Sequence, residues 1–316
     1  MEKSIRLGIS SCLLGERVRW DGAHKLDRYL TDTLGKFVEY VPVCPEVECG
    51  FDIPREPFRQ VGDPDSPRLI TSRTKIDYTD RMNRWARKRV IELEKEDLCG
   101  FIFKSRSPSS GMERVKVYSE KGVPVKKGVG LFARAFMQHF PLLPVEEDGR
   151  LHDPILRENF IERIFAFKRW RDILDEKQSR GNLVDFHTRH KMLILSHGPQ
   201  HHRVMGKLVA RAKEVPLKDL YEEYQKLFME TLRLKTTSKK NANVLSHILG
   251  YFKKYLSGDE KQELLEIIDL YRQGTVPLIV PITLVNHYVR KYNQPYLKEQ
   301  YYLHPHPLEL QLRNHV

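Results

Sequence analysis

Residues 5–15 of this 316-residue chain are IRLGISSCLLG, and they indicate how the first half folds. The apolar run Ile5 to Ile9 is typical of a buried strand, and a loop with serine, cysteine and glycine follows it. Apolar runs of the same kind occur at 37–43 and 99–104. Residues 79–96, between the last two, have the apolar spacing of an amphipathic helix. Strands that alternate with helices predict a parallel α/β layer.

The pattern changes in the second half of the chain. We expect a fourth strand at 115–118, but from Asp153 onward long helical patterns replace the strands. Proline at 154 is typical of the first turn of a helix. The sequence therefore predicts two domains. An α/β domain with a small, mostly parallel sheet is expected at 1–145, and an all-α domain at 150–316.

Composition narrows the class of protein. Lys and Arg number 54 against 42 Asp and Glu, and the net charge of +12 favours an anionic partner such as nucleic acid. No stretch approaches the ~20 apolar residues of a membrane span, and the N-terminus has no secretion signal, so we expect a cytoplasmic protein without a membrane partner. The sequence contains no G-x-G-x-x-G or P-loop pattern, so no nicotinamide cofactor is expected.

Three polar loops directly follow predicted strands. Their sequences are SSCLLG at 10–15, CPEVECG at 44–50 and KSRSPSSG at 104–111. In an open α/β sheet, ligands bind at the carboxyl ends of the strands, so these loops are expected to converge on one site. Thiolates in such a site could hold zinc or an iron–sulfur cluster. The alternative is that the cysteines are small buried residues in tight turns, as we expect for Cys99.

The motifs S-x-C-L-L-G with W-D-G, V-C-P-E, and K-S-x-S-P-S-x-G resemble those of the thiouracil desulfidase family over residues 4–140. The resemblance implies a [4Fe-4S] cluster on three cysteines, whose free iron takes the sulfur of the substrate. Cys12 and Cys44 match two of its ligands. It also implies catalytic roles for Glu46 and Ser107. We further assign three residues of these loops to substrate binding: Ser11, Lys104 and Ser110.

This chain departs from the family motif at one position. Ser110 stands where the usual motif S-P-S-C-G has cysteine. We expect Cys49, five residues after Cys44, to supply the third cluster ligand from a neighbouring loop. The alternatives are serine as the third ligand, which binds soft iron less well, or a fold kept without the cluster.

The second half resembles the all-helical domain that is often fused to such desulfidases, over residues 155–312. Its matching segments begin at His187 (HTRHKMLILSH), Thr236 (TTSKKNANVLSHILGYFKK) and Pro277 (PLIVPITLVNHY). The fused form is similar to enzymes that convert 4-thiouridine in tRNA to uridine, so the resemblance implies that this domain holds tRNA. One helix offers cations for phosphates and an amide for bases: Lys239, Lys240, Asn243, Lys253 and Lys254. The alternative is that these residues form a solvated basic face.

The predicted function is hydrolytic removal of sulfur from 4-thiouridine in tRNA, with release of sulfide. Glu46 would move the proton of the attacking water, and Ser107 would hydrogen-bond the base or that water. Two alternatives stay open. One is an enzyme that acts on free thiouracil or a thionucleoside, and the other is a non-catalytic, metal-stabilised nucleic-acid-binding protein.

Overall fold

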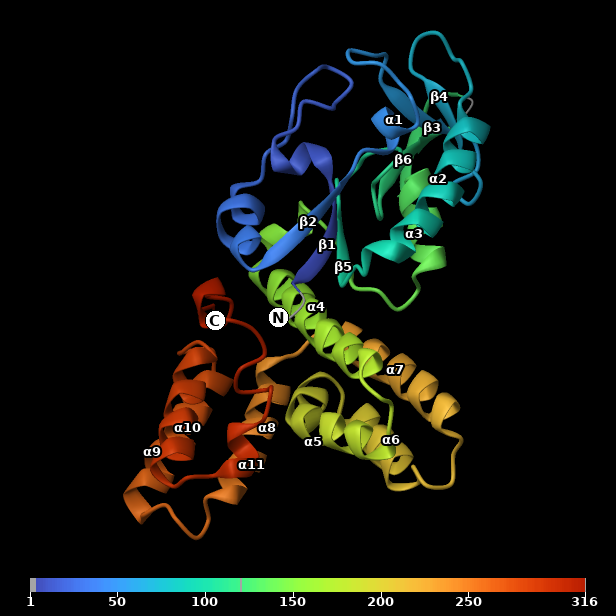
Figure 1. Ribbon diagram of the computed structural model, residues 1–316. Coiled ribbons are helices and arrows are strands. Elements are labelled where there is room, and N and C mark those ends of the chain that lie inside the picture. The colour runs from blue at the N-terminus through green and yellow to red at the C-terminus, as the bar shows by residue number, and fades with distance from the viewer. Residues whose placement is uncertain (1–3, 120, 316) are drawn as a thin grey trace. The chain divides into compact units, whose positions relative to one another are not determined.

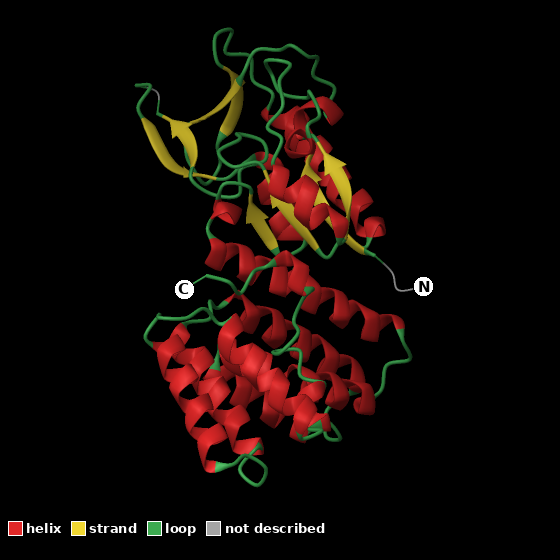
Figure 2. Cartoon of the chain, turned by 90° about the vertical axis from the view of Figure 1, so that its left-hand side faces the viewer, coloured by secondary structure: helices red, strands yellow, loops and turns green. Residues whose placement is uncertain are grey.

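The computed structural model describes residues 4–119 and 121–315. The chain folds into two compact units, Met1–Asp153 and Pro154–Val316. All strands among the described residues belong to the first unit, and the second contains helices and loops (Figure 2). The predicted fold class, an α/β region followed by an all-α region, is confirmed. Residues 145–147 form a strand of the first unit. The first unit therefore extends beyond residue 145, where the sequence predicted its end.

A four-stranded parallel sheet carries the three polar loops. It consists of β1 (Ile5–Ser10), β2 (Val38–Val43), β5 (Gly100–Phe103) and β8 (Val145–Glu147), in the spatial order β2-β1-β5-β8 (Figure 1). The side chains of Leu7, Ile9 and Phe101 are fully buried. Continuous apolar runs such as these are typical of parallel strands that are covered on both faces.

Helix packing explains one glycine of β1. Helix α3 (Leu131–His139) places Phe132 and Phe136 against the ring of Phe101, with ring centroids 5.7 and 4.6 Å from it. A Cβ atom at Gly8 would lie 2.2 Å from the same ring, so only glycine lets this aromatic cluster pack on β1.

The other regular helices of the first unit are α1 (Pro45–Glu48) and α2 (Thr79–Leu93). Short 3-10 helices and one π-helix connect the elements: η1 (Ser11–Leu14), η2 (Tyr29–Thr33, π), η3 (Leu34–Lys36), η4 (Glu94–Glu96), η5 (Arg150–His152) and, in the second unit, η6 (Leu308–Leu310).

The first unit also contains a second sheet that the sequence analysis did not predict. Its strands are β3 (Phe58–Val61), β4 (Arg68–Thr71), β6 (Val115–Tyr118) and β7 (Pro124–Gly128), in the order β4-β3-β6-β7. The segment at 115–118 is a strand as predicted, but it pairs parallel to β3 and antiparallel to β7, outside the sheet that holds β1. Polar residues such as Arg59 and Gln60 interrupt the apolar pattern of β3, which is why the strand is difficult to recognise in the sequence.

The second unit is a helical array around an aromatic core. Trp170 and Tyr224 stack with their ring centroids 5.3 Å apart, and both are fully buried. No helix among the described residues is long and apolar enough to cross a membrane. The helices are α4 (Pro154–Asp175), α5 (Arg180–His197), α6 (Pro199–Ala210), α7 (Leu217–Arg233), α8 (Ser238–Tyr251), α9 (Gly258–Arg272), α10 (Ile279–Lys291) and α11 (Pro295–Lys298).

A buried ionic network ties the last residues of the chain to α4. Arg313 lies 3.3 Å from Glu158 and 3.5 Å from Glu162, and His197 lies 3.4 Å from Glu162. Burial raises the pKa of Glu162, but His197 and Arg313 outweigh burial and lower that pKa to about 2. The carboxylate of Glu162 therefore stays ionised inside the helical unit.

Candidate active site

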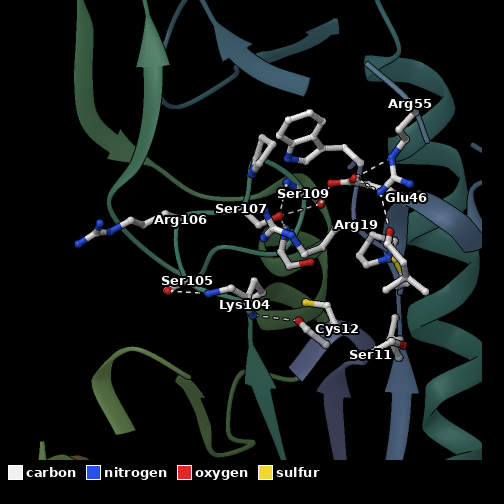
Figure 3. A pocket seen from close by; sticks show the side chains of 18 residues that line it. Ser11, Cys12, Arg19, Glu46, Arg55, Lys104, Ser105, Arg106, Ser107 and Ser109 are labelled. Atoms are coloured by element: carbon white, nitrogen blue, oxygen red, sulfur yellow. Dashed lines mark hydrogen bonds and ion pairs between the residues drawn. The ribbon is translucent and has the colours of Figure 1, made fainter. Parts of the chain in front are cut away.

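A pocket of about 210 Å³ lies at the carboxyl ends of β1, β2 and β5. The three loops that follow these strands all contribute to its lining, as predicted (Figure 3). The lining residues are Ser10, Ser11, Cys12, Val18, Arg19, Trp20, Val43, Cys44, Pro45, Glu46, Arg55, Lys104, Ser105, Arg106, Ser107, Pro108, Ser109 and Ser110. The volume is small beside the ~300–1,000 Å³ of typical ligand sites, so the pocket suits a single ring better than a whole nucleotide.

Cys12 lies directly beyond the end of β1. The strand ends in the 3-10 helix η1, which stops at Gly15 in the left-handed conformation (φ 94°), where glycine is favoured. Burial raises the pKa of the Cys12 thiol to about 11, against the opposing effect of the Lys104 ammonium. Cys44 lines the same pocket as Cys12.

Cys44 is the N-cap residue of α1, with Pro45 in the first turn. Its backbone N–H donates to Glu48 at 2.9 Å, and Glu48 also pairs with Arg89 at 2.8 Å. Glu48 therefore braces the turn that presents Cys44 and does not itself line the pocket. Burial raises the pKa of the Cys44 thiol as well.

Glu46 and Ser107, the two predicted catalytic residues, are connected through Ser109. The Ser109 hydroxyl donates to Glu46 Oε1 at 2.8 Å, and the Ser107 and Ser109 hydroxyl oxygens are 3.0 Å apart (Figure 3). Because the Ser109 hydrogen is engaged by the carboxylate, the Ser107 hydroxyl is the donor between the two serines. The result is a directional chain from Ser107 to Glu46.

Arg55 is a site residue that the sequence analysis did not identify. Its Nε donates to Glu46 Oε2 at 3.0 Å, its Nη2 donates to the same oxygen, and Nη2 also donates to the Val18 carbonyl at 3.0 Å. The guanidinium thus orients the carboxylate and joins it to the loop after β1. No motif in the sequence marks Arg55, because only the folded chain brings it to Glu46.

The third loop is held from several sides. Lys104 Nζ pairs with Asp148 at 2.6 Å, so this predicted substrate-binding cation already has a carboxylate partner. The fully buried Gln60 of β3 donates from Nε2 to the Pro108 carbonyl at 2.9 Å and to the Val129 carbonyl at 2.7 Å. These fixed contacts keep the serines of the loop in place and provide a rigid support for the site.

Arg106 differs from the other cations of the pocket. It has a positive φ of 61°, which is uncommon for a residue with a side chain, and the side chain is exposed. Its guanidinium points away from Glu46 and Cys12 (Figure 3). Among the ion pairs of the described residues, none involves Arg106, whereas Arg19, Arg55 and Lys104 each have a carboxylate partner.

The two residues considered for the third cluster ligand lie in different surroundings. Ser110 is buried and lines the pocket. Cys49 is the C-cap of the one-turn helix α1 and packs with Leu69, Met82 and Leu131 in a hydrophobic cluster. The structure therefore does not bring Cys49 into the pocket, because the helix places its N-cap and C-cap at opposite ends. Cys99 is buried in the core, as expected.

The five residues predicted to bind tRNA divide between two places. Lys239, Lys240 and Asn243 line a hollow in the helical unit. Lys253 and Lys254 are exposed but lie beyond Tyr251, the last residue of α8, and do not line it. Helix α8 thus ends before Lys253 and Lys254, so the five residues do not all lie on the one helix expected for them.

Two protein families match this chain. Residues 7–148 match the 2-thiouracil desulfurase family, and residues 191–307 match a family described as protein of unknown function (DUF1722). The fold and site thus define a two-domain protein, with a 2-thiouracil desulfurase domain followed by a helical DUF1722 domain. The chain belongs to the family of the uncharacterized protein YbgA of Escherichia coli (strain K12). It is 32% identical to YbgA over 153 residues, which are 48% of this chain and 90% of YbgA.

A solved structure is also similar to part of the chain. It is the [4Fe-4S]-dependent thiouracil desulfidase TudS, with 26% sequence identity and a TM-score of 0.40. The match covers 48% of this chain and 95% of TudS.

The donor atoms of the pocket can be compared with the needs of an iron–sulfur cluster. Among the described residues, no three His, Cys, Asp or Glu side chains come together as a metal site. The pocket offers two thiols, Cys12 and Cys44, and the hydroxyl of Ser110 at the position of the third family ligand. Two of these donors are the soft thiolates that iron prefers, and the third is a harder hydroxyl oxygen, which binds soft iron less well.

Proposed function

We propose that this protein hydrolyses the carbon–sulfur bond of a thiolated uracil, and that its substrate is 4-thiouridine in tRNA. One observation carries the proposal: two thiols and the Ser107–Ser109–Glu46 chain meet in a base-sized pocket at the ends of parallel strands. The match of residues 7–148 to the 2-thiouracil desulfurase family supports the same chemistry.

The reaction replaces sulfur with oxygen without net oxidation. The oxygen of a water molecule adds to C4 of the base, the C4–S bond breaks, and the sulfur leaves as hydrogen sulfide. A water molecule at Ser107 passes one proton to Ser107, while the Ser107 hydrogen moves to Ser109 and the Ser109 hydrogen to Glu46, which returns it along the same hydroxyls to the departing sulfur. The oxygen on C4 loses the second water proton as the C4–S bond breaks, and this proton also goes to the sulfur, so both leave in hydrogen sulfide. Arg55 keeps the carboxylate aligned for this transfer.

We further propose that Cys12, Cys44 and Ser110 hold a [4Fe-4S] cluster. When bound, the cluster supplies a Lewis-acidic iron with affinity for the sulfur of the substrate. Both thiols have pKa values raised by burial, and metal ligation requires the thiolate form, so cluster binding releases protons. A reducing compartment such as the cytoplasm keeps these thiols available for ligation.

Trp20 and Arg106 provide contacts for a base within a polynucleotide. The Trp20 ring lines the pocket and is 43% exposed, so one face is available for stacking on a pyrimidine. Arg106 carries an unpaired charge outward from the same pocket, and we expect it to meet a backbone phosphate of the substrate. Free thiouracil would use the pocket but not this cation, which favours a nucleotide or RNA substrate.

The proposal is tested with anaerobically purified protein and three substrates: thiolated tRNA, free 4-thiouridine and free 4-thiouracil. We expect equal amounts of uridine and sulfide from the tRNA, at a kcat/KM well above that for the free compounds. Equal kcat/KM for all three would reject the tRNA substrate. The lack of sulfide release from each of them would reject the desulfidase.

A further inference from the structure

Strands β6 and β7 of the second sheet carry a group of positive charges that the active site does not use. The two strands contain Lys116, Lys126 and Lys127 and no acidic residue, and we call them the basic arm. All three lysines are exposed, and none of the ion pairs found among the described residues involves them. Glu113, the acid that most closely precedes β6, pairs instead with two arginines, at 2.6 and 3.0 Å.

The register of the basic arm places these charges side by side. Lys116 of β6 lies directly opposite Lys126 of β7, and a register shift beside this pair leaves Lys127 as an extra residue. Like charges opposite each other on neighbouring strands destabilise a sheet, and a bulge re-aims the side chain of the extra residue. The chain thus holds three ammonium groups together at an energetic cost, which a bound anion would remove.

A fourth cation lies on the same face of the sheet. Arg59 of β3 precedes the fully buried Gln60, which lies beside the fully buried Val117 of β6 in the parallel pair. Because side chains alternate between the two faces of a strand, Arg59, Lys116 and Tyr118 are on the face opposite Gln60. The Arg59 guanidinium lies over the Tyr118 ring, 5.3 Å from its centroid. A cation held by an aromatic ring therefore adjoins the lysines of the arm.

Protection of a sheet edge explains only part of this charge. Lysines on an edge strand prevent it from pairing with another chain, and β7 is an edge strand in the order β4-β3-β6-β7. This role would account for Lys126 and Lys127. It does not account for Lys116 or Arg59, which belong to the two inner strands. The cations extend over three neighbouring strands and form a surface for an anion.

The basic arm is fastened to the loop that lines the active-site pocket. The backbone N–H of Gly130 donates to the carbonyl of Gly111, the last residue of that loop, at 2.7 Å. Gln60 Nε2 donates to the carbonyls of Pro108 and Val129, at 2.9 and 2.7 Å. Strand β6 begins four residues after Gly111, and β7 ends two residues before Gly130. Both ends of the arm are therefore held at the pocket loop.

We infer that the basic arm binds the phosphates of the nucleotides that flank the target base in an RNA substrate. An RNA chain whose thiolated base occupies the pocket continues past the pocket loop, where the arm begins. Phosphate contacts position a nucleic acid without reading its sequence, so the arm suits thiolated RNA of varied sequence. The inference rests on the proposed function, because free thiouracil has no flanking phosphates.

The test measures binding of the full-length protein to an unmodified tRNA transcript by fluorescence anisotropy at several salt concentrations. The variant Lys116→Ala/Lys126→Ala/Lys127→Ala removes the three charges of the arm. Each phosphate contact contributes about 0.7–0.9 to the slope of log affinity against log salt, so we expect the slope to fall by about 2. The melting temperature of this variant should stay the same or rise, because the repulsion between Lys116 and Lys126 is gone.

The matched control, Arg84→Ala/Arg87→Ala/Lys88→Ala, removes three exposed charges from α2 of the same unit. An equal fall of the slope in the control overturns the inference, because general charge would then explain binding. An unchanged slope in the arm variant overturns it too. Loss of binding to polyglutamate with normal binding to the transcript would point to an acidic polypeptide and also reject it. A protein that binds the transcript through the arm but releases no sulfide from any thiolated substrate would reject the proposed function alone.

Discussion

The Ser109 hydroxyl donates to Glu46 Oε1 at 2.8 Å, and this bond joins residues that are 63 positions apart in the chain. Ser109 is 1% exposed, and the amide groups of Phe132 and Ala133 donate to its carbonyl at the start of α3. The serine is therefore held by its backbone while its side chain connects the loop after β5 to the loop after β2. The connection makes Glu46, Ser107 and Ser109 one hydrogen-bonded unit.

Replacement of Glu46 by glutamine should remove the acceptor at the end of this chain. We expect kcat to fall by about 10²–10⁴, the usual contribution of a positioned acid or base, while the iron content stays unchanged. Single-turnover assays with thiolated RNA measure the effect. Glu92→Gln is the matched control, since Glu92 is exposed on α2, lies outside the pocket lining and should retain kcat. Equal losses in both variants would remove Glu46 from the mechanism.

Ser109→Ala should interrupt proton transfer without removing the carboxylate. A hydrogen bond to a charged group contributes about 1.5–3 kcal/mol, so a loss of about 10- to 100-fold in kcat is expected. Ser107→Ala should have a similar effect, and the double variant should be little worse than either one, because the hydroxyls act in series. Additive losses in the double variant would contradict a single chain.

The iron content should depend on the cysteines of the pocket and not on the other two. Cys12→Ala and Cys44→Ala should each lose most of the iron, whereas Cys49→Ala and Cys99→Ala should keep it. Ser110→Cys should increase cluster stability in air, because thiolate binds iron better than oxygen does. Iron and sulfide assays and the visible spectrum of anaerobically prepared protein measure these effects. Loss of iron in Cys49→Ala with retention in Ser110→Ala would show that Cys49 is the ligand.

Trp20→Ala should affect substrate binding more than chemistry. Base stacking on an aromatic ring contributes about 1–3 kcal/mol, so we expect KM to rise about tenfold or more while kcat changes little. Trp20→Phe should restore most of the affinity, because it retains an aromatic face. Steady-state kinetics with thiolated RNA measure both parameters. A normal KM in Trp20→Ala would exclude stacking at this position.

Acid should loosen the helical unit through Glu162. Its pKa is lowered from 4.5 to about 2 in the folded protein, so it contributes stability that is present above about pH 5. That stability should disappear as the pH falls from 5 toward 2. Glu162→Gln should cost about 1.5–3 kcal/mol at neutral pH, because His197 and Arg313 each lose a contact with a buried carboxylate while Glu158 stays beside Arg313. Hydrogen exchange of α4 amides measures both effects, and Glu222→Gln on the exposed face of α7 is the control.

The fold class and most of the pocket residues could be predicted from the sequence. Apolar runs at 5–9, 37–43 and 99–104 predicted three parallel strands, because strands buried on both faces need continuous apolar sequence. The loops after those strands had to meet, since parallel strands end at one edge of the sheet. Cys12, Cys44, Glu46 and Ser107 could therefore be placed together from the sequence.

The contacts between distant segments became visible only in the folded chain. Arg55 lies on Glu46 and Gln60 holds the serine loop, although neither belongs to a recognisable motif. The sequence alone could not separate Cys49 from Ser110, because five positions of spacing do not reveal that a one-turn helix directs Cys49 into a hydrophobic cluster. A residue's neighbours along the chain follow from local geometry, but its partners across the fold depend on how the elements pack.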